Sequence, residues 1–173
     1  ITDSLVGSEM CIRDSKCPVS SVFMASTGVI GEKLNYKKII TKIPKMSENL
    51  KEGNWNKAAT AITTTDTFPK GASEVALIGN KKIQITGIAK GSGMIAPDMA
   101  TMLSFIFTDA NIPSSILQTL LSRNVQNTFN AITVDSDAST SDTLLLFATG
   151  AAKSIAPTSA DDPVLKDLSL IHI

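Results

Sequence analysis

The chain has 173 residues and carries 16 lysines and arginines against 16 aspartates and glutamates, so its formal net charge at pH 7 is zero. Because no basic stripe interleaved with aromatic residues occurs, we expect no nucleic-acid partner. The apolar runs are strand-sized and fall short of the roughly 18 residues that a membrane-spanning helix needs, so we expect no membrane partner either.

Both ends of the chain resemble translated sequencing adapter. Residues 1–15 include the run LVGSEMCIRDS, and residues 168–173 read LSLIHI. We set these ends aside, as one does with an expression tag, and expect residues 16–167 to be an internal piece of a longer protein. A segment of that length is enough for one domain of ordinary size.

The distribution of histidine and cysteine excludes several kinds of site. The single histidine, His172, and one of the two cysteines, Cys11, lie in the ends set aside, which leaves Cys17. A Ser-His-Asp triad, a Cys-His pair and an ordinary zinc site are therefore excluded within the segment. Cys17 itself is interpreted as a small apolar residue rather than a thiol nucleophile. Without a disulfide framework, we expect a reducing compartment and a cytoplasmic location.

The first predicted element is a short buried strand from Val19 to Ala25. This strand would deliver Ser26, Thr27 and Gly28 to a tight turn. A glycine just after a buried strand lets a backbone N–H approach a ligand closely, so the turn is a candidate binding element. The alternative is an ordinary turn between a strand and a helix.

Two short helices are predicted next, followed by a threonine-rich loop. The first helix starts near Asn35 and is interrupted near Pro44, because proline breaks a helix interior. The second helix has apolar residues at three- and four-residue spacing, namely Trp55, Ala58, Ala59 and Ile62. It ends at the run from Thr63 to Thr67, which we interpret as a loop, with a polar ligand pocket as the alternative.

The pattern then changes to that of strands. Residues 74–89 predict a β-hairpin with Gly79-Asn80 as its turn, and residues 102–107 predict a further buried strand. Between them, Gly91 and Gly93 imitate a dinucleotide-binding fingerprint. We reject that interpretation because Pro97 follows within a turn's length and no long helix opens from the glycines.

A helix, an acidic loop and a strand complete the predicted elements. The helix begins at Ile112-Pro113 and runs to about Val125, with Asn111 as its cap. The acidic loop, residues 135–142, lacks the glycine and the glutamate that a calcium-binding loop requires, so we expect no metal there. Residues 143–148 predict a strand. Strands interspersed with amphipathic helices indicate the α/β class.

A candidate nucleophile lies where a glycine-rich approach meets the strand that begins at Met102. A threonine inside a chain is a poor nucleophile, because its hydroxyl needs a base to take the proton. If the chain were cut between Ala100 and Thr101, the free α-amine of Thr101, with a pKa of about 8, would lie within reach of its own Oγ and act as that base. The alternative is that Ala100-Thr101 only starts a strand.

Five sequence blocks stand out in this order: STGVIGE at 26–32, TTDTFPK at 64–70, GIAKGSGMI at 87–95, MATML at 99–103 and ITVD at 132–135. Together they resemble the bifunctional ornithine acetyltransferase (glutamate N-acetyltransferase) family of arginine biosynthesis. The resemblance covers essentially the whole segment and implies that the family's opening region and C-terminal part are absent. It also implies an αββα-type layered sandwich and no metal or cofactor.

The resemblance implies that the protein cuts itself. Members of the family are made as one chain and are cut between the residues that match Ala100 and Thr101. Residues 16–100 would then form the C-terminal part of an α chain, and residues 101–167 the N-terminal part of a β chain. The whole would be a self-cleaving enzyme with an N-terminal threonine nucleophile.

Four further residues match functional positions of the family. Thr27 and Gly28 match the pair that forms the oxyanion hole, with a hydroxyl and a backbone N–H as donors. Thr64 and Lys90 match substrate-contacting positions, although the hydroxyls of Thr65 and Thr67 are alternatives to that of Thr64. Lys90 would pair with a substrate carboxylate.

The implied activity is acetyl transfer from N2-acetylornithine to L-glutamate through a ping-pong acyl-enzyme on Thr101, in an α/β assembly made from one precursor. Bifunctional members also take the acetyl group from acetyl-CoA and monofunctional members do not, and both readings stay open. One rival is a self-processing amidase or aminopeptidase that passes the acyl group to water. The other is a non-catalytic domain on the same fold, which a single uncleaved species would favour.

Overall fold

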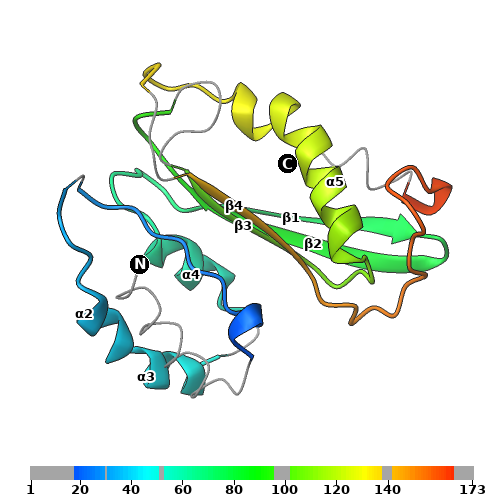
Figure 1. The fold of residues 1–173 in the computed structure, drawn as a ribbon, viewed down its shortest axis with the longest axis horizontal. Helices are drawn as coiled ribbons and strands as arrows, with labels where there is room; N and C mark the ends of the chain where they lie inside the picture. Colours follow the sequence, from blue (N-terminus) through cyan, green and yellow to red (C-terminus); the bar gives the residue numbers. More distant parts are fainter. Residues whose placement is uncertain (1–17, 30, 51–52, 96–101, 138–141, 166–173) are drawn as a thin grey trace. The chain divides into compact units, whose positions relative to one another are not determined.

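Figure 1 shows the computed structural model, which describes residues 18–29, 31–50, 53–95, 102–137 and 142–165. The chain divides into two compact units, residues 1–54 and residues 55–173, and each is described by itself. The two ends set aside above lie outside the described residues, as do Cys17, Ala100 and Thr101.

The first unit contains short helices. A single 3₁₀ turn, η1 (Val19–Ser21), precedes α2 (Tyr36–Ile40) and α3 (Ile43–Glu48). Pro44 lies in the first turn of α3, where its missing N–H would have no intrahelical partner in any case. The predicted helix and its interruption near Pro44 are therefore confirmed.

The predicted strand from Val19 to Ala25 is wrong. Beyond η1 the chain is irregular as far as Val29, and Phe23 and Met24 are 59% and 52% exposed. A strand needs a neighbour for its backbone hydrogen bonds, and the described residues of this unit contain no other strand. A short apolar run does not by itself identify a strand, which is why the pattern misled.

The second unit is built on a four-stranded sheet in the order β1-β2-β3-β4. The strands are β1 (Lys70–Ile78), β2 (Lys81–Lys90), β3 (Leu103–Thr108) and β4 (Thr143–Ala148). β2 is antiparallel to both of its neighbours, β1 and β3, whereas β3 and β4 are parallel. Gly79 has a φ of 56° at the first position of the two-residue turn, where hairpins favour glycine. The predicted hairpin is confirmed, and its first strand begins at Lys70 rather than Glu74.

Helices cover both faces of this sheet (Figure 1), with α5 (Ser114–Asn124) on one face and α4 (Trp55–Ala61) on the other. On the α5 face, Ile116 and Leu117 pack with Ile83 and Ile106, which are each 1% exposed. Three short 3₁₀ turns complete the unit, namely η2 (Val125–Asn127), η3 (Phe129–Ala131) and η4 (Pro163–Leu165).

The α4 face is packed by aromatic rings. The ring centroids of Trp55 and Phe107 are 5.2 Å apart, and Phe107 stacks on Phe147 at 5.0 Å. Because successive side chains of a strand point to opposite faces, Phe107 faces α4 while its neighbour Ile106 faces α5. The helix predicted over residues 55–62 is confirmed as α4 (Trp55–Ala61). Its first residue, Trp55, packs it against the sheet.

The predicted cap of α5, Asn111, is wrong. The residue that precedes the helix is Pro113, with φ −59° and ψ 144°, and no side chain caps it. Asn111 instead donates its backbone N–H to Oγ of Ser154 at 3.0 Å, which ties the start of the helix to a later loop. A long-range partner thus replaces the local cap that the sequence favours.

The chain is therefore a mixed α/β protein, as the pattern of elements predicts. Within the described ranges, no helix combines the length and the apolar character that crossing a bilayer requires.

Candidate active site

One end of β2, one end of β3 and one end of β4 lie side by side, and we call this place the sheet edge. Lys90, the last residue of β2, pairs with Leu103, the first residue of β3, and Leu103 pairs with Thr143, the first residue of β4. Residues just outside these strand ends are therefore neighbours in space although they lie far apart in the sequence. Thr101 is two residues before Leu103 in the chain.

Lys90 is buried at this edge, with 2% of its surface exposed. Burial lowers the pKa of its ammonium group below the ordinary value, while the negative charges of Asp66 and Asp142 act in the opposite direction. The positive charge of Lys70 adds slightly to the lowering. A buried lysine flanked by carboxylates is a suitable point charge for one further carboxylate, such as that of an amino-acid ligand.

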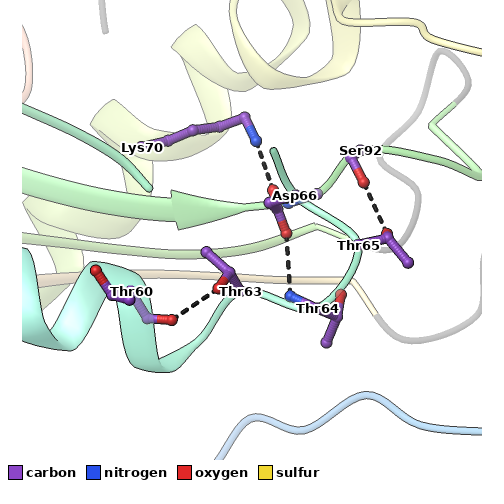
Figure 2. Close-up of polar contacts among 8 residues, drawn as sticks. Thr60, Thr63, Thr64, Thr65, Asp66, Lys70 and Ser92 are labelled. Atoms are coloured by element: carbon purple, nitrogen blue, oxygen red, sulfur yellow. Dashed lines mark hydrogen bonds and ion pairs between the residues drawn. The ribbon is translucent and has the colours of Figure 1, made fainter. Parts of the chain in front are cut away.

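Asp66 joins the threonine-rich loop to the end of β2. Its Oδ1 accepts hydrogen bonds from the backbone N–H of Gly91 at 2.8 Å and from the ammonium group of Lys70 at 2.5 Å. Its Oδ2 accepts from the backbone N–H of Thr64 at 3.3 Å (Figure 2). Burial alone would raise the pKa of Asp66, but these donors outweigh it and lower the pKa to about 2.

The threonine hydroxyls of the same loop differ in their hydrogen-bond partners. Thr65 and Ser92 share a hydrogen bond of 2.7 Å between their hydroxyl oxygens, which is a second link between the loop and the glycine-rich segment (Figure 2). The hydroxyl of Thr63 donates to the carbonyl of Thr60 at the end of α4. Thr64 is exposed beside these anchored neighbours, so it is better placed than Thr65 to meet a ligand.

The acidic loop binds backbone N–H groups. The carboxylate of Asp135 accepts from Met94 at 2.6 Å and from Ile95 at 3.0 Å. These N–H groups lower the pKa of Asp135. Oδ1 of Asp142 accepts from the N–H of Met102 at 2.7 Å. The two carboxylates therefore bind the described residues that precede and follow residues 96–101.

A cavity of about 430 Å³ opens beside this edge. Its lining is mostly apolar and comes from the first three strands together with Phe129, Ile132 and Val134. The charged residues among those that line it are Lys70, Glu74 and Lys90. In the described part of the chain, no group of three or more His, Cys, Asp or Glu side chains is arranged to hold a metal ion.

The structure places the expected site residues as follows. Thr64 and Lys90 both lie in the second unit, where Asp66 joins Thr64 to Gly91, the residue directly after Lys90. Thr27 and Gly28 lie in the irregular segment of the first unit, where Thr27 is partly buried and Gly28 is exposed. Ala100 and Thr101 lie outside the described residues.

Sequence reasoning missed the three carboxylates that organise the edge. Asp66 lies within the threonine-rich run, and Asp135 and Asp142 were considered only as metal ligands. The one local signal was the position of Asp142 immediately before a strand, where its carboxylate can reach the backbone of a parallel neighbour.

Comparison with known proteins finds a family model that matches the chain and several proteins of similar sequence. The family model described as "ArgJ family" matches residues 4–169. A protein of Bartonella quintana named "Arginine biosynthesis bifunctional protein ArgJ" is 58% identical over 150 residues, which are 86% of this chain and 36% of the relative. Proteins of the same name from Gluconobacter oxydans and Brucella suis are 52% and 56% identical over 154 residues, covering 89% and 87% of this chain.

The chain thus spans little more than a third of these relatives, at 36% to 37% of their length. Within that third the similarity extends over nearly every described element, from the first unit to the loop after β4. The chain therefore belongs to the ArgJ family.

Proposed function

We propose that this chain is part of an acetyltransferase that moves the acetyl group of N2-acetylornithine to L-glutamate, giving ornithine and N-acetylglutamate. The name of the relatives refers to arginine biosynthesis, which supports amino-acid substrates. The observation that carries the proposal is the register of β2 against β3. It sets the buried cation of Lys90 opposite Leu103, two residues beyond Thr101.

The first step is self-cleavage. Oγ of Thr101 attacks the carbonyl carbon of Ala100, and the peptide bond becomes an ester while the nitrogen of Thr101 becomes a free amine. Water then hydrolyses the ester, leaving a carboxylate on Ala100 and the hydroxyl on Thr101. Residues 16–100 and 101–167 thereafter belong to different chains, and Thr101 carries its own base.

The second step is acetyl transfer through a shared intermediate. The α-amine of Thr101 takes the hydroxyl proton, and Oγ attacks the acetyl carbon of N2-acetylornithine. Thr27 and Gly28 donate hydrogen bonds to the resulting oxyanion, and loss of one such donor raises the barrier by roughly 3 kcal/mol. Ornithine leaves with the proton as its free amine. The amine of glutamate then attacks the acetyl ester, the bond from the acetyl carbon to Oγ of Thr101 breaks, and the proton lost by the amine returns to Oγ by way of the α-amine. Lys90 binds the carboxylate that both amino acids carry, beside Thr64.

The remaining features of the proposal concern the whole protein. The α and β chains stay together in one assembly, in a layered αββα sandwich to which the four-stranded sheet contributes one layer. The enzyme works in the cytoplasm without a metal or an organic cofactor. Acetyl-CoA is a second acetyl donor if the protein is bifunctional, as the name of its relatives describes them.

Replacement of the nucleophile tests the proposal. The full-length Thr101→Ala protein is expected to remain one chain in an intact-mass spectrum and to transfer no acetyl group. Thr101→Ser, which keeps a hydroxyl and an α-amine, is the matched control and should retain cleavage and part of the transfer. Release of acetate without transfer to glutamate would instead identify an amidase. Full transfer by uncut Thr101→Ala would refute the proposal.

A further inference from the structure

We propose that Asp66 is a positioning residue for substrate binding, which holds Thr64 and Lys90 in a fixed relation at the sheet edge. The inference rests on the proposed function, because it takes these two residues as the ones that contact substrate. It assigns a role to a carboxylate that does not itself touch substrate.

The hydrogen bonds of Asp66 carry the inference. Its carboxylate is fully buried, with 0% of the side chain exposed, and both oxygens accept. One oxygen binds the N–H of Thr64, and the other binds the N–H of Gly91, the residue directly after Lys90. Charge-assisted bonds of this kind are about twice as strong as neutral ones. A shift of the carboxylate would therefore displace both substrate-contacting residues at once.

A second contact runs beside the first. The hydroxyls of Thr65 and Ser92 are 2.7 Å apart, and each lies one residue farther along its segment than the residues that Asp66 binds. Figure 2 shows this second link. Together with the bond from Gly91 to Asp66, it fixes the loop against the glycine-rich segment at two consecutive positions. Two points of attachment restrain both the separation of the segments and their relative rotation.

The charges around Asp66 give it a further effect on Lys90. Lys70 neutralises the carboxylate directly, with its ammonium also 4.9 Å from the ring centroid of Phe68. Asp66 still attracts the ammonium of Lys90, as Asp142 does, against the effect of burial. Loss of the Asp66 charge would therefore lower the pKa of Lys90 further.

The experiment compares variants of the full-length, self-cleaved enzyme. Asp66→Asn is expected to raise the KM for both N2-acetylornithine and glutamate by about tenfold, since small misplacements of binding groups have effects of this size or larger. Its kcat should change by less than about threefold, and its self-cleavage should still go to completion. Asp161→Asn is the matched control, because it removes one carboxylate charge from an exposed ion pair with Arg123 and should leave KM unchanged.

Thr65→Val keeps the test decisive if Asp66→Asn does not fold. It breaks the second link without removing a charge, and it should raise both KM values about threefold. Lower thermal stability with unchanged KM in these variants would overturn the inference, since it would assign Asp66 to the fold alone. If the wild-type enzyme neither cleaves itself nor transfers acetyl, the proposed function fails. If it does both and KM is insensitive to these changes, only the inference fails.

Discussion

At the scale of the residue, the proposed function depends on Lys90, which it assigns to the substrate carboxylate. Only 2% of its surface is exposed, and burial lowers the pKa of its ammonium group. The negative charges of Asp66 and Asp142 oppose this lowering. Both carboxylates also have other partners, because Asp66 forms an ion pair with Lys70 and Asp142 accepts a hydrogen bond from a backbone N–H. In the proposed function, a substrate carboxylate is a further partner of the Lys90 ammonium group.

Replacing the lysine tests this point. Lys90→Met in the full-length enzyme should raise KM for both amino acids by ten- to a hundredfold, as expected on loss of a charged hydrogen bond of roughly 1.5 to 3 kcal/mol. Lys82→Met, on the exposed part of the same strand, is the control and should have the KM of wild type. Equal KM values for the two variants would remove Lys90 from the substrate site.

The carboxylate of Asp66 makes stability depend on pH. Its pKa is about 2 in the fold against an ordinary value of 3.8. Because the folded value is the lower one, the stabilisation is complete above about pH 4 and is lost as the pH falls toward 2. Urea unfolding should show that the difference in unfolding free energy between wild type and Asp66→Asn shrinks across this window. A difference that stayed constant from neutral pH to pH 2 would contradict the assignment.

At the scale of the element, local patterns were sufficient for the strands and helices of the second unit and for the helices of the first, but not for residues 19–25. The hairpin turn at Gly79, the strand at residues 102–107 and the helix after Pro113 all have short-range signals, and all are confirmed. The strand expected at Val19 to Ala25 had only an apolar run in its favour, and no neighbour pairs with it among the described residues. Strand formation depends on a partner that the segment itself does not encode.

The candidate site was predictable only in part, for a related reason. The motifs pointed to Thr64 and Lys90, but the bonds that join them cross long stretches of sequence. The N–H of Gly91 is 25 residues from Asp66, and that of Met102 is 40 residues from Asp142. Such pairs leave no periodic or local signal. The parallel alignment of β3 and β4 brings the second pair together.

That alignment leads to a prediction about self-cleavage. Asp142→Ala removes the acceptor for the N–H of Met102, the residue after the proposed nucleophile, and should slow cleavage of the full-length precursor about tenfold or more. Asp142→Asn keeps an oxygen acceptor at the same place and should cleave within about threefold of the wild-type rate. The time course of the uncut band on a denaturing gel gives both rates. Equal, wild-type rates in both variants would exclude a positioning role.

At the scale of the whole molecule, the proposed cut falls between two strands that pair with each other. β2 lies before Ala100-Thr101 and β3 lies after it, and their antiparallel ladder runs from Ile85↔Thr108 to Lys90↔Leu103. Asp135, on the later side, also binds the N–H groups of Met94 and Ile95 on the earlier side. Cleavage would therefore leave two chains that share one sheet, with the second chain entering it at Leu103, the partner of Lys90.

Mass spectrometry of the full-length protein, incubated with N2-acetylornithine in the absence of glutamate, tests the central claim most directly. We predict one complex under native conditions and two chains after denaturation, with the second chain beginning at Thr101 and heavier by one acetyl group on that residue. Addition of glutamate should remove the acetyl group. A protein that remained a single chain and still exchanged acetyl groups at full rate would contradict the account.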